Sequence, residues 1–129
     1  MPIVKQLTAW TENRPGRLGE VAAALGEKKI NIFALWAGMA GERWAIRMIV
    51  DKPAAAKKHL QALGWEITEE EVLRVSLPDN PGSLGRTARK LEAAGMNIEY
   101  GYTSRAKVAG KIDNYFALTD AVAALKALR

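Results

Sequence analysis

The segment ENRPGRLGEVAAALGEKKINI, residues 12–32, returns as DNPGSLGRTARKLEAAGMNI at residues 79–98. From Pro15 to Ile32 each matching pair lies 66 positions apart, and no gap interrupts this part of the alignment. The pairs are Pro15/Pro81, Gly16/Gly82, Leu18/Leu84, Gly19/Gly85, Ala22/Ala88, Leu25/Leu91, Asn31/Asn97 and Ile32/Ile98. Agreement in a single register, with a Pro-Gly pair at its head, indicates that the 129 residues contain two copies of one small unit.

The two copies are predicted as module 1, residues 1–69, and module 2, residues 70–129. In each copy a β-rich run precedes the Pro-Gly turn, a helical stripe follows it, and two alternating runs lead to a second helix. Predicted strands of the first copy cover 3–11, 30–37, 43–50 and 65–68, and those of the second cover 72–77, about 98–103 and 112–118. The last helix begins near residue 119 and leaves no residues for a closing strand in module 2.

This β-α-β-β-α-β order predicts an α+β fold of two tandem ferredoxin-like modules. Each module is expected to form an antiparallel sheet with its helices on one face, and the second is expected to lack its final strand. Helix starts and stops agree with this plan, because Pro53 suits a first helical turn after Asp51 and Gly26 and Gly64 suit helix ends.

Alternation along the strands predicts which side chains face the core. Ile32, Ala34 and Trp36 are expected to point inward, as are Ile98, Tyr100 and Tyr102 in the second copy. The other face of the first copy carries Phe33 and Leu35, with Ile49 on the neighbouring strand. An apolar face turned away from the helices needs a cover, so these three residues are predicted to form a homodimer interface. The alternative is that Phe33 and Leu35 face the core.

Composition excludes several classes of site. The chain has no cysteine and one histidine, His59, so no catalytic residue, metal site or cofactor is predicted, and His59 is expected to have no role. The net charge is +5, but the basic residues are scattered, so neither a nucleic acid nor a membrane is an expected partner. The N-terminus lacks the pattern of a secretory signal, and a cytoplasmic location is expected.

The turn before the first helix, Asn-x-Pro-Gly-x-Leu-Gly at Asn13–Gly19, followed by Asn31-Ile32, resembles the ACT domain. The second copy repeats it at Asn80–Gly85 and Asn97-Ile98, with one residue fewer before the Pro-Gly. The resemblance implies a small-molecule sensor, most often of amino acids, that regulates an attached or separate enzyme and is not itself an enzyme. It also implies ligand sites at these turns and between paired modules.

The chemistry of the turn agrees with that implication. A glycine lets a ligand approach the main chain, and the free N–H groups at a helix N-terminus attract anions. The predicted ligand-binding residues are Asn13, Arg14, Pro15, Gly16, Arg17, Leu18, Asn31 and Ile32, with Asn80, Pro81, Gly82, Ser83, Leu84 and Asn97. Because Ser83 replaces Arg17, the first copy is expected to bind anions more strongly. Asn-Pro-Gly is also simply a good turn and helix start, and that reading stays open.

The sequence therefore predicts an amino-acid-binding regulatory protein that acts through ligand-dependent packing of modules or subunits. A homodimer and a separate regulated enzyme are the expected partners. The first alternative is a structural or adaptor module that works through Phe33 and Leu35. The second is nucleic-acid binding, which the polar run Asn97, Glu99, Gly101 does not favour because RNA-binding sheets expose aromatic and basic side chains.

Overall fold

The structure, a computed structural model, describes residues 2–129. The chain divides into two compact units. The first unit contains residues 5–70, and the second unit contains residues 2–4 together with residues 71–129. The predicted boundary between the modules, after residue 69, lies inside the strand Glu66–Pro78. This strand begins in the first unit and ends in the second.

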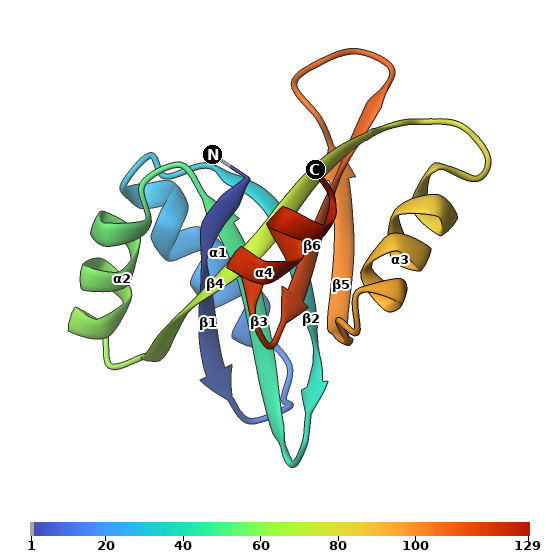
Figure 1. Ribbon diagram of the computed structural model, residues 1–129. Coiled ribbons are helices and arrows are strands. Elements are labelled where there is room, and N and C mark those ends of the chain that lie inside the picture. The colour runs from blue at the N-terminus through green and yellow to red at the C-terminus, as the bar shows by residue number, and fades with distance from the viewer. Residues whose placement is uncertain (1) are drawn as a thin grey trace. The chain divides into compact units, whose positions relative to one another are not determined.

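The described residues contain six strands and four helices, in the order expected of an antiparallel α+β fold (Figure 1). They are β1 (Ile3–Thr11), α1 (Arg17–Glu27), β2 (Ile32–Ala40), β3 (Arg43–Val50), α2 (Pro53–Ala62), β4 (Glu66–Pro78), α3 (Ser83–Ala93), β5 (Ile98–Arg105), β6 (Lys111–Leu118) and α4 (Ala121–Ala127). The predicted fold class, a tandem pair of ferredoxin-like modules, is confirmed.

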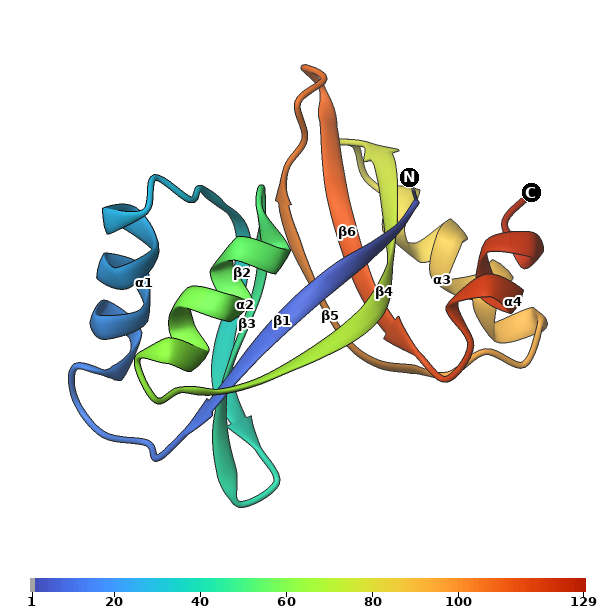
Figure 2. The same ribbon diagram turned by 90° about the vertical axis from the view of Figure 1, so that its left-hand side faces the viewer.

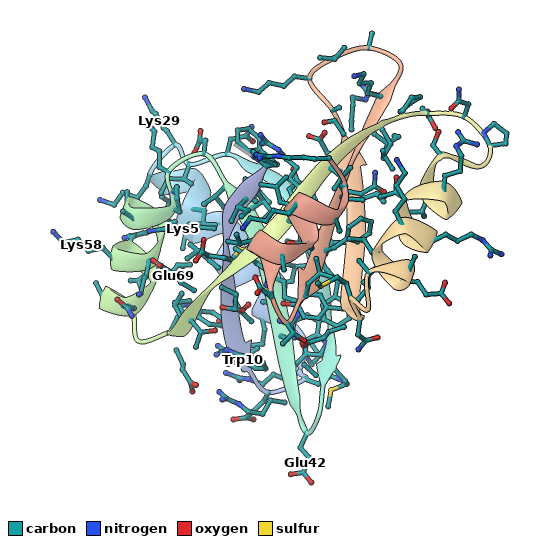
Figure 3. The ribbon with its side chains drawn as sticks, in the orientation of Figure 1. Lys5, Trp10, Lys29, Glu42, Lys58 and Glu69 are labelled. Carbon is teal, nitrogen blue, oxygen red and sulfur yellow. The ribbon has the colours of Figure 1, made fainter. Side chains whose placement is uncertain are left out.

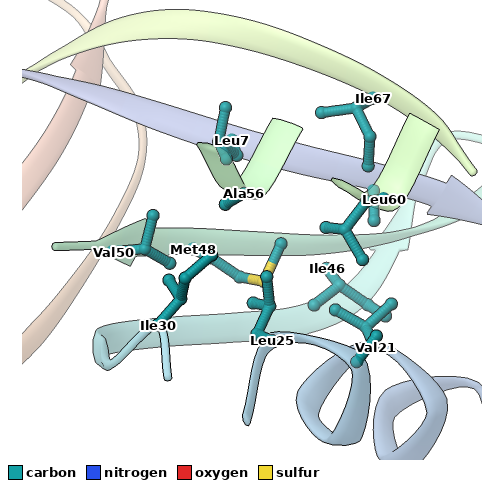
Figure 4. Close-up of a cluster of buried hydrophobic side chains, with 12 residues drawn as sticks. Leu7, Val21, Leu25, Ile30, Ile46, Met48, Val50, Ala56, Leu60 and Ile67 are labelled. Carbon is teal, nitrogen blue, oxygen red and sulfur yellow. The ribbon is translucent and has the colours of Figure 1, made fainter. Parts of the chain in front are cut away.

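In the first unit the strands are ordered β2-β3-β1-β4, and α1 and α2 lie together on one face of that sheet (Figure 2). The core between sheet and helices contains Leu7, Met48, Leu25 and Leu60, none of which is exposed to solvent (Figure 4). The predicted stripe of α1 is confirmed at Val21 and Leu25. Closing this core removes water from apolar surface on both helices, which is what holds them on the sheet.

In the second unit, β6 pairs with β4 on one side and with β5 on the other, and α3 and α4 cover one face of this sheet. Leu73, Leu91, Phe116 and Ala124 form its buried core. No strand follows α4 within the described chain, as the sequence predicted.

Residues 2–4 take the place beside β4 that a closing strand would occupy in the second unit. The backbone N–H of Arg74 donates to the carbonyl oxygen of Pro2 at 2.5 Å. The side chain of Ile3 packs against the core of Leu73 and Phe116. The start of β1 therefore protects an edge of β4 that would otherwise present unpaired backbone groups.

A β-bulge in β2 changes which side chains face the core of the first unit. Ile32 lies opposite Val50, but Ala34 lies opposite Ile49, so one extra residue enters at Phe33. Beyond it the alternation is reversed. Leu35 and Ala37 pack against the core, and Trp36 lies opposite Arg47 on the other face.

The predicted outward position of Leu35 and the predicted inward positions of Ala34 and Trp36 are therefore wrong, because alternation was extended through an unrecognised bulge. The alternative that Leu35 faces the core is right. Phe33 is 43% exposed, and Ile49 is buried at 4%. The interface role proposed for Phe33 and Ile49 stays a prediction.

The second unit has the same bulge between Ile98 and Tyr100. Tyr100 and Tyr102 were expected to face inward, and that expectation is wrong for the same reason. Tyr102 lies opposite Tyr115 and stacks on it, with ring centroids 5.3 Å apart. Gly101 faces the core instead, and a Cβ atom added there would lie only 3.0 Å from the ring of Phe116.

We expect Ile3→Ala to lower the free energy of unfolding by about 1–2 kcal/mol, because it removes apolar contacts from a half-buried side chain. Chemical denaturation measures this loss, and hydrogen exchange should show faster exchange of the Arg74 amide. Lys5→Ala, an exposed neighbour, serves as the control. Unchanged stability and unchanged exchange would show that the second unit does not depend on residues 2–4.

Candidate functional site

The two strand-to-helix turns have the same backbone geometry. Gly16 has φ 92° and ψ −15°, and Gly82 has φ 91° and ψ −14°. These are values of the third residue of a type II turn, where a Cβ atom is unfavourable. Each glycine caps the helix that follows, and no side chain supplies a capping hydrogen bond.

The prolines of both turns lie outside the helices. Pro15 and Pro81 each lie one residue before the glycine cap. The positive φ of the glycine cannot belong to a right-handed helix, so the helices begin one residue later. The first helical residues are therefore Arg17 and Ser83.

At the first turn lies a pocket of about 360 Å³. Its lining residues are Trp10, Thr11, Glu12, Arg17, Glu42, Arg43, Gly64, Trp65 and Glu66. They come from the end of β1, the start of α1, the β2–β3 hairpin and the start of β4. In Figure 3, Trp10 and Glu42 lie at this end of the first unit.

Arg17 is held in place by three neighbours. Its Nε–H donates to Thr11 Oγ1 at 2.6 Å, and its Nη1 donates to Glu20 Oε2 at 2.7 Å. The guanidinium carbon also lies 4.0 Å from the ring centroid of Trp65. These contacts fix a cation at the wall of the pocket, and they restrict its rotamers before any ligand arrives.

The opposite wall is an exposed ion pair above an aromatic ring. Arg43 donates from Nη1 and Nη2 to the two carboxylate oxygens of Glu66, at 2.9 and 2.6 Å. This hydrogen bonding raises the pKa of Arg43 and lowers the pKa of Glu66. The guanidinium carbon of Arg43 lies 5.2 Å from the centroid of Trp10.

The helix end itself adds positive potential to this pocket. The first hydrogen bond of α1 runs from the N–H of Glu20 to the carbonyl of Gly16, at 2.9 Å. The backbone N–H groups of residues 17–19 precede that bond, and the positive end of the helix dipole lies with them. Of these residues Arg17 lines the pocket, where its guanidinium can bind a carboxylate, and Glu12 and Glu42 can bind a cation.

The second turn borders a smaller pocket of about 300 Å³, whose lining mixes apolar and polar side chains and includes one acidic residue, Asp79, but no basic residue. It is lined by Leu77, Pro78, Asp79, Asn80, Ser83, Leu84, Thr103, Ile112 and Asn114. Ser83 Oγ donates to Asn80 Oδ1 at 2.8 Å. Asn114 is 3% exposed and donates to the carbonyl oxygens of Val75 and Ile112, both at 3.2 Å.

The structure brings together only part of each predicted site. Of the eight residues predicted at the first turn, Arg17 lines the pocket; Asn13, Arg14, Pro15, Gly16 and Leu18 lie at the exposed turn beside it. Asn80, Ser83 and Leu84 line the second pocket, with Pro81 and Gly82 in the adjoining turn.

The Asn-Ile pairs lie away from the turns of their own units. Asn31 and Ile32 follow the far end of α1, whose 11 residues span about 16 Å. Asn31 instead pairs with Asp51: its N–H donates to Asp51 Oδ1 at 3.0 Å, and its carbonyl accepts from the N–H of Asp51 at 3.1 Å. Asn97 occupies the corresponding place after α3.

Sequence reasoning missed most of the pocket lining. Trp10 and Trp65 are distant in sequence and look like core aromatics. Asn114 is the polar exception among the alternate residues Ile112, Asn114, Phe116 and Leu118. No cluster of three or more histidine or acidic side chains that could hold a metal occurs among residues 2–129. None of the helices described is long and apolar enough to cross a membrane.

Comparison with known proteins matches the family described as an ACT domain pair to residues 2–114. Protein BT0572 from Bacteroides thetaiotaomicron is similar in structure at 28% identity, with a TM-score of 0.88 over 98% of this chain and 87% of that one. The ligand-free regulatory subunit of aspartate kinase from Thermus thermophilus shares the fold at 20% identity, with a TM-score of 0.72 over 100% and 94% of the chains. No curated protein sequence matches.

We expect Gly16→Ala to lower the free energy of unfolding by about 1–2 kcal/mol, because a Cβ atom is strained at φ 92°. An added Cβ there would lie 3.6 Å from Glu20 Oε1, so strain rather than a clash causes the loss. Gly19→Ala is the matched control: it lies within α1 with open space around it and should raise stability by up to about 1 kcal/mol. Equal effects in thermal unfolding would contradict the role of Gly16.

Proposed function

Because this chain belongs to the ACT family as an ACT domain pair, we propose that it is a regulatory protein that binds a free amino acid at the first strand-to-helix turn. ACT domains are regulatory modules, and regulatory subunits of aspartate kinase share the fold of this chain. The observation that carries the proposal is the fixed guanidinium of Arg17 beside the uncapped N-terminus of α1.

The charges of the first pocket suit a zwitterion. Arg17 and the first-turn amides of α1 bind the α-carboxylate, where two sources of positive potential coincide. Glu12 or Glu42 accepts hydrogen bonds from the α-ammonium group. The rings of Trp10 and Trp65 contact the ligand's side chain, and an apolar side chain makes the larger gain from that contact.

The second pocket makes a weaker site for the same ligand. Ser83 offers a hydroxyl where the first unit offers a guanidinium, and that hydroxyl already donates to Asn80. A neutral hydrogen bond stabilises a carboxylate less than a charge-assisted one does. The two turns therefore differ in affinity, and one amino acid per chain binds at low concentration.

Regulation follows if the ligand binds one packing arrangement of modules or subunits better than another. We propose a homodimer as the assembly and a separate enzyme as its target, and no catalytic role for this chain. Of the three residues predicted at the homodimer interface, Phe33 is the one that the structure leaves exposed, at 43%, and it is one of several exposed apolar side chains in the described residues.

Calorimetric titration of the protein with each of the twenty amino acids tests the proposal. We expect saturable heat for one or a few of them at one site per chain. Arg17→Gln should weaken that binding at least about tenfold, because it removes a charge-assisted hydrogen bond.

Arg14→Gln is the matched control, since Arg14 lies in the same turn but does not line the pocket. It should leave the affinity within about twofold, because its guanidinium is exposed and solvent and salt weaken its attraction for the ligand. Absence of heat with every amino acid, or equal losses in the two variants, would contradict amino-acid binding at the first turn.

A further inference from the structure

A second hollow lies on the helical side of the first unit, between the end of α1 and the outer surface of α2. We call it the lysine groove; its volume is about 380 Å³. It is lined by Lys28, Ile30, Lys52, Ala55, Lys58, His59 and Ala62. This size is in the range of pockets that hold small organic molecules.

The lining combines basic and apolar side chains. Lys28, Lys52 and Lys58 contribute three ammonium groups, and no acidic side chain is among the described residues that line the groove. The apolar part comes from Ile30, Ala55 and Ala62, together with the methylene stems of the lysines.

The helix ends at the groove reinforce the positive potential. Lys52 is the N-cap of α2, whose first turn contains no acidic residue and no side-chain cap. At the other end, the carbonyls of Leu25 and Gly26 that close α1 accept backbone N–H groups from residues 28–30, so their negative charge is already compensated. The N–H groups in the first turn of α2 have no side-chain cap, so the positive end of the helix dipole adds to the potential of the lysines.

His59 provides an independent sign of a missing contact. It lines the groove, and its Nε2 atom is inaccessible to solvent with no hydrogen-bond partner among the residues described. A buried polar atom without a partner is uncommon and carries a free-energy cost. Because solvent does not reach this atom, the imidazole has to turn toward the groove before a bound polar group can remove that cost.

We propose that the lysine groove is a binding site for a small organic anion, one acidic group on a hydrophobic body. The acidic group is bound by Lys52 and Lys58 at the start and outer side of α2. The hydrophobic body lies against Ile30, Ala55 and Ala62. This site is separate from the first-turn pocket, with which it shares no lining residue, and it does not rest on the amino-acid proposal.

Two lysines of the same unit that lie outside the groove provide a control. Lys57 and Lys5 lie 3.6 and 3.7 Å from Glu69, and neither lines the groove. In Figure 3, Lys58 extends outward from α2, and Lys5 and Glu69 lie close together. Replacing Lys5 and Lys57 removes the same charge as replacing Lys52 and Lys58.

The test uses 8-anilinonaphthalene-1-sulfonate, a fluorescent anion with an aromatic body, titrated into the intact chain. We expect one saturable site. The double variant Lys52→Gln/Lys58→Gln should weaken binding at least about fivefold, because two surface charge interactions are lost. The control Lys5→Gln/Lys57→Gln should change affinity less than about twofold, because its charges already face Glu69.

A second pair of variants leaves the charge unchanged. Ala55→Leu fills the groove and should weaken binding, whereas Ala54→Leu, an exposed neighbour outside the groove, should not. Thermal unfolding shows whether each variant is folded. Equal affinity across the charge variants, or insensitivity to Ala55→Leu, would overturn the proposal, and neither result would bear on amino-acid binding at the first turn.

Discussion

Each unit passes from its first strand into its first helix through a glycine with φ near +90°, and the side chain that the turn presents to the adjoining pocket depends on that constraint. The positive φ ends the extended backbone of the first strand, and it keeps the glycine itself outside the helix. As a result the residue after the glycine, Arg17 or Ser83, becomes the first residue of the helix. That residue lines the pocket beside the turn in both units, so the conformation of the glycine determines which side chain begins the helix there.

The two copies keep this geometry and change the chemistry around it. In the first unit Arg17 stacks on Trp65 and donates to Thr11. In the second unit Ser83 donates to Asn80. The buried Asn114 lies two residues before the core residue Phe116, and the corresponding residue of the first unit, two before Met48, is the apolar Ile46. Duplication therefore preserved the backbone of the site while its charge diverged.

The sequence was enough to predict the repeat, the order of elements and the residues of the turns, because Pro-Gly signals and helical periodicity are local. The bulges at Phe33 and Glu99 could not be foreseen, since an extra residue between paired strands leaves no local signature. The shift of one residue turns Leu35 toward the core, and it turns Tyr102 to the opposite face of its sheet, where Tyr102 is buried against Tyr115.

The candidate site was harder to predict than the fold. Its turn residues are adjacent in sequence, but Trp10, Arg43 and Trp65 come from three other segments and meet only when the sheet forms. The sequence also did not predict which residues lie beside the edge of β4 in the second unit. Nothing near the C-terminal helix indicates that Pro2 and Ile3 supply the strand beside Arg74.

The central claim, amino-acid binding at the first turn, is tested most directly by locating the ligand. Nuclear magnetic resonance of the ¹⁵N-labelled protein, with each of the twenty amino acids added in turn, reports every backbone amide. The account predicts that a binding amino acid shifts the amides of residues 11–17 and 64–66 most. Shifts centred elsewhere, or no shifts with any amino acid, would contradict it.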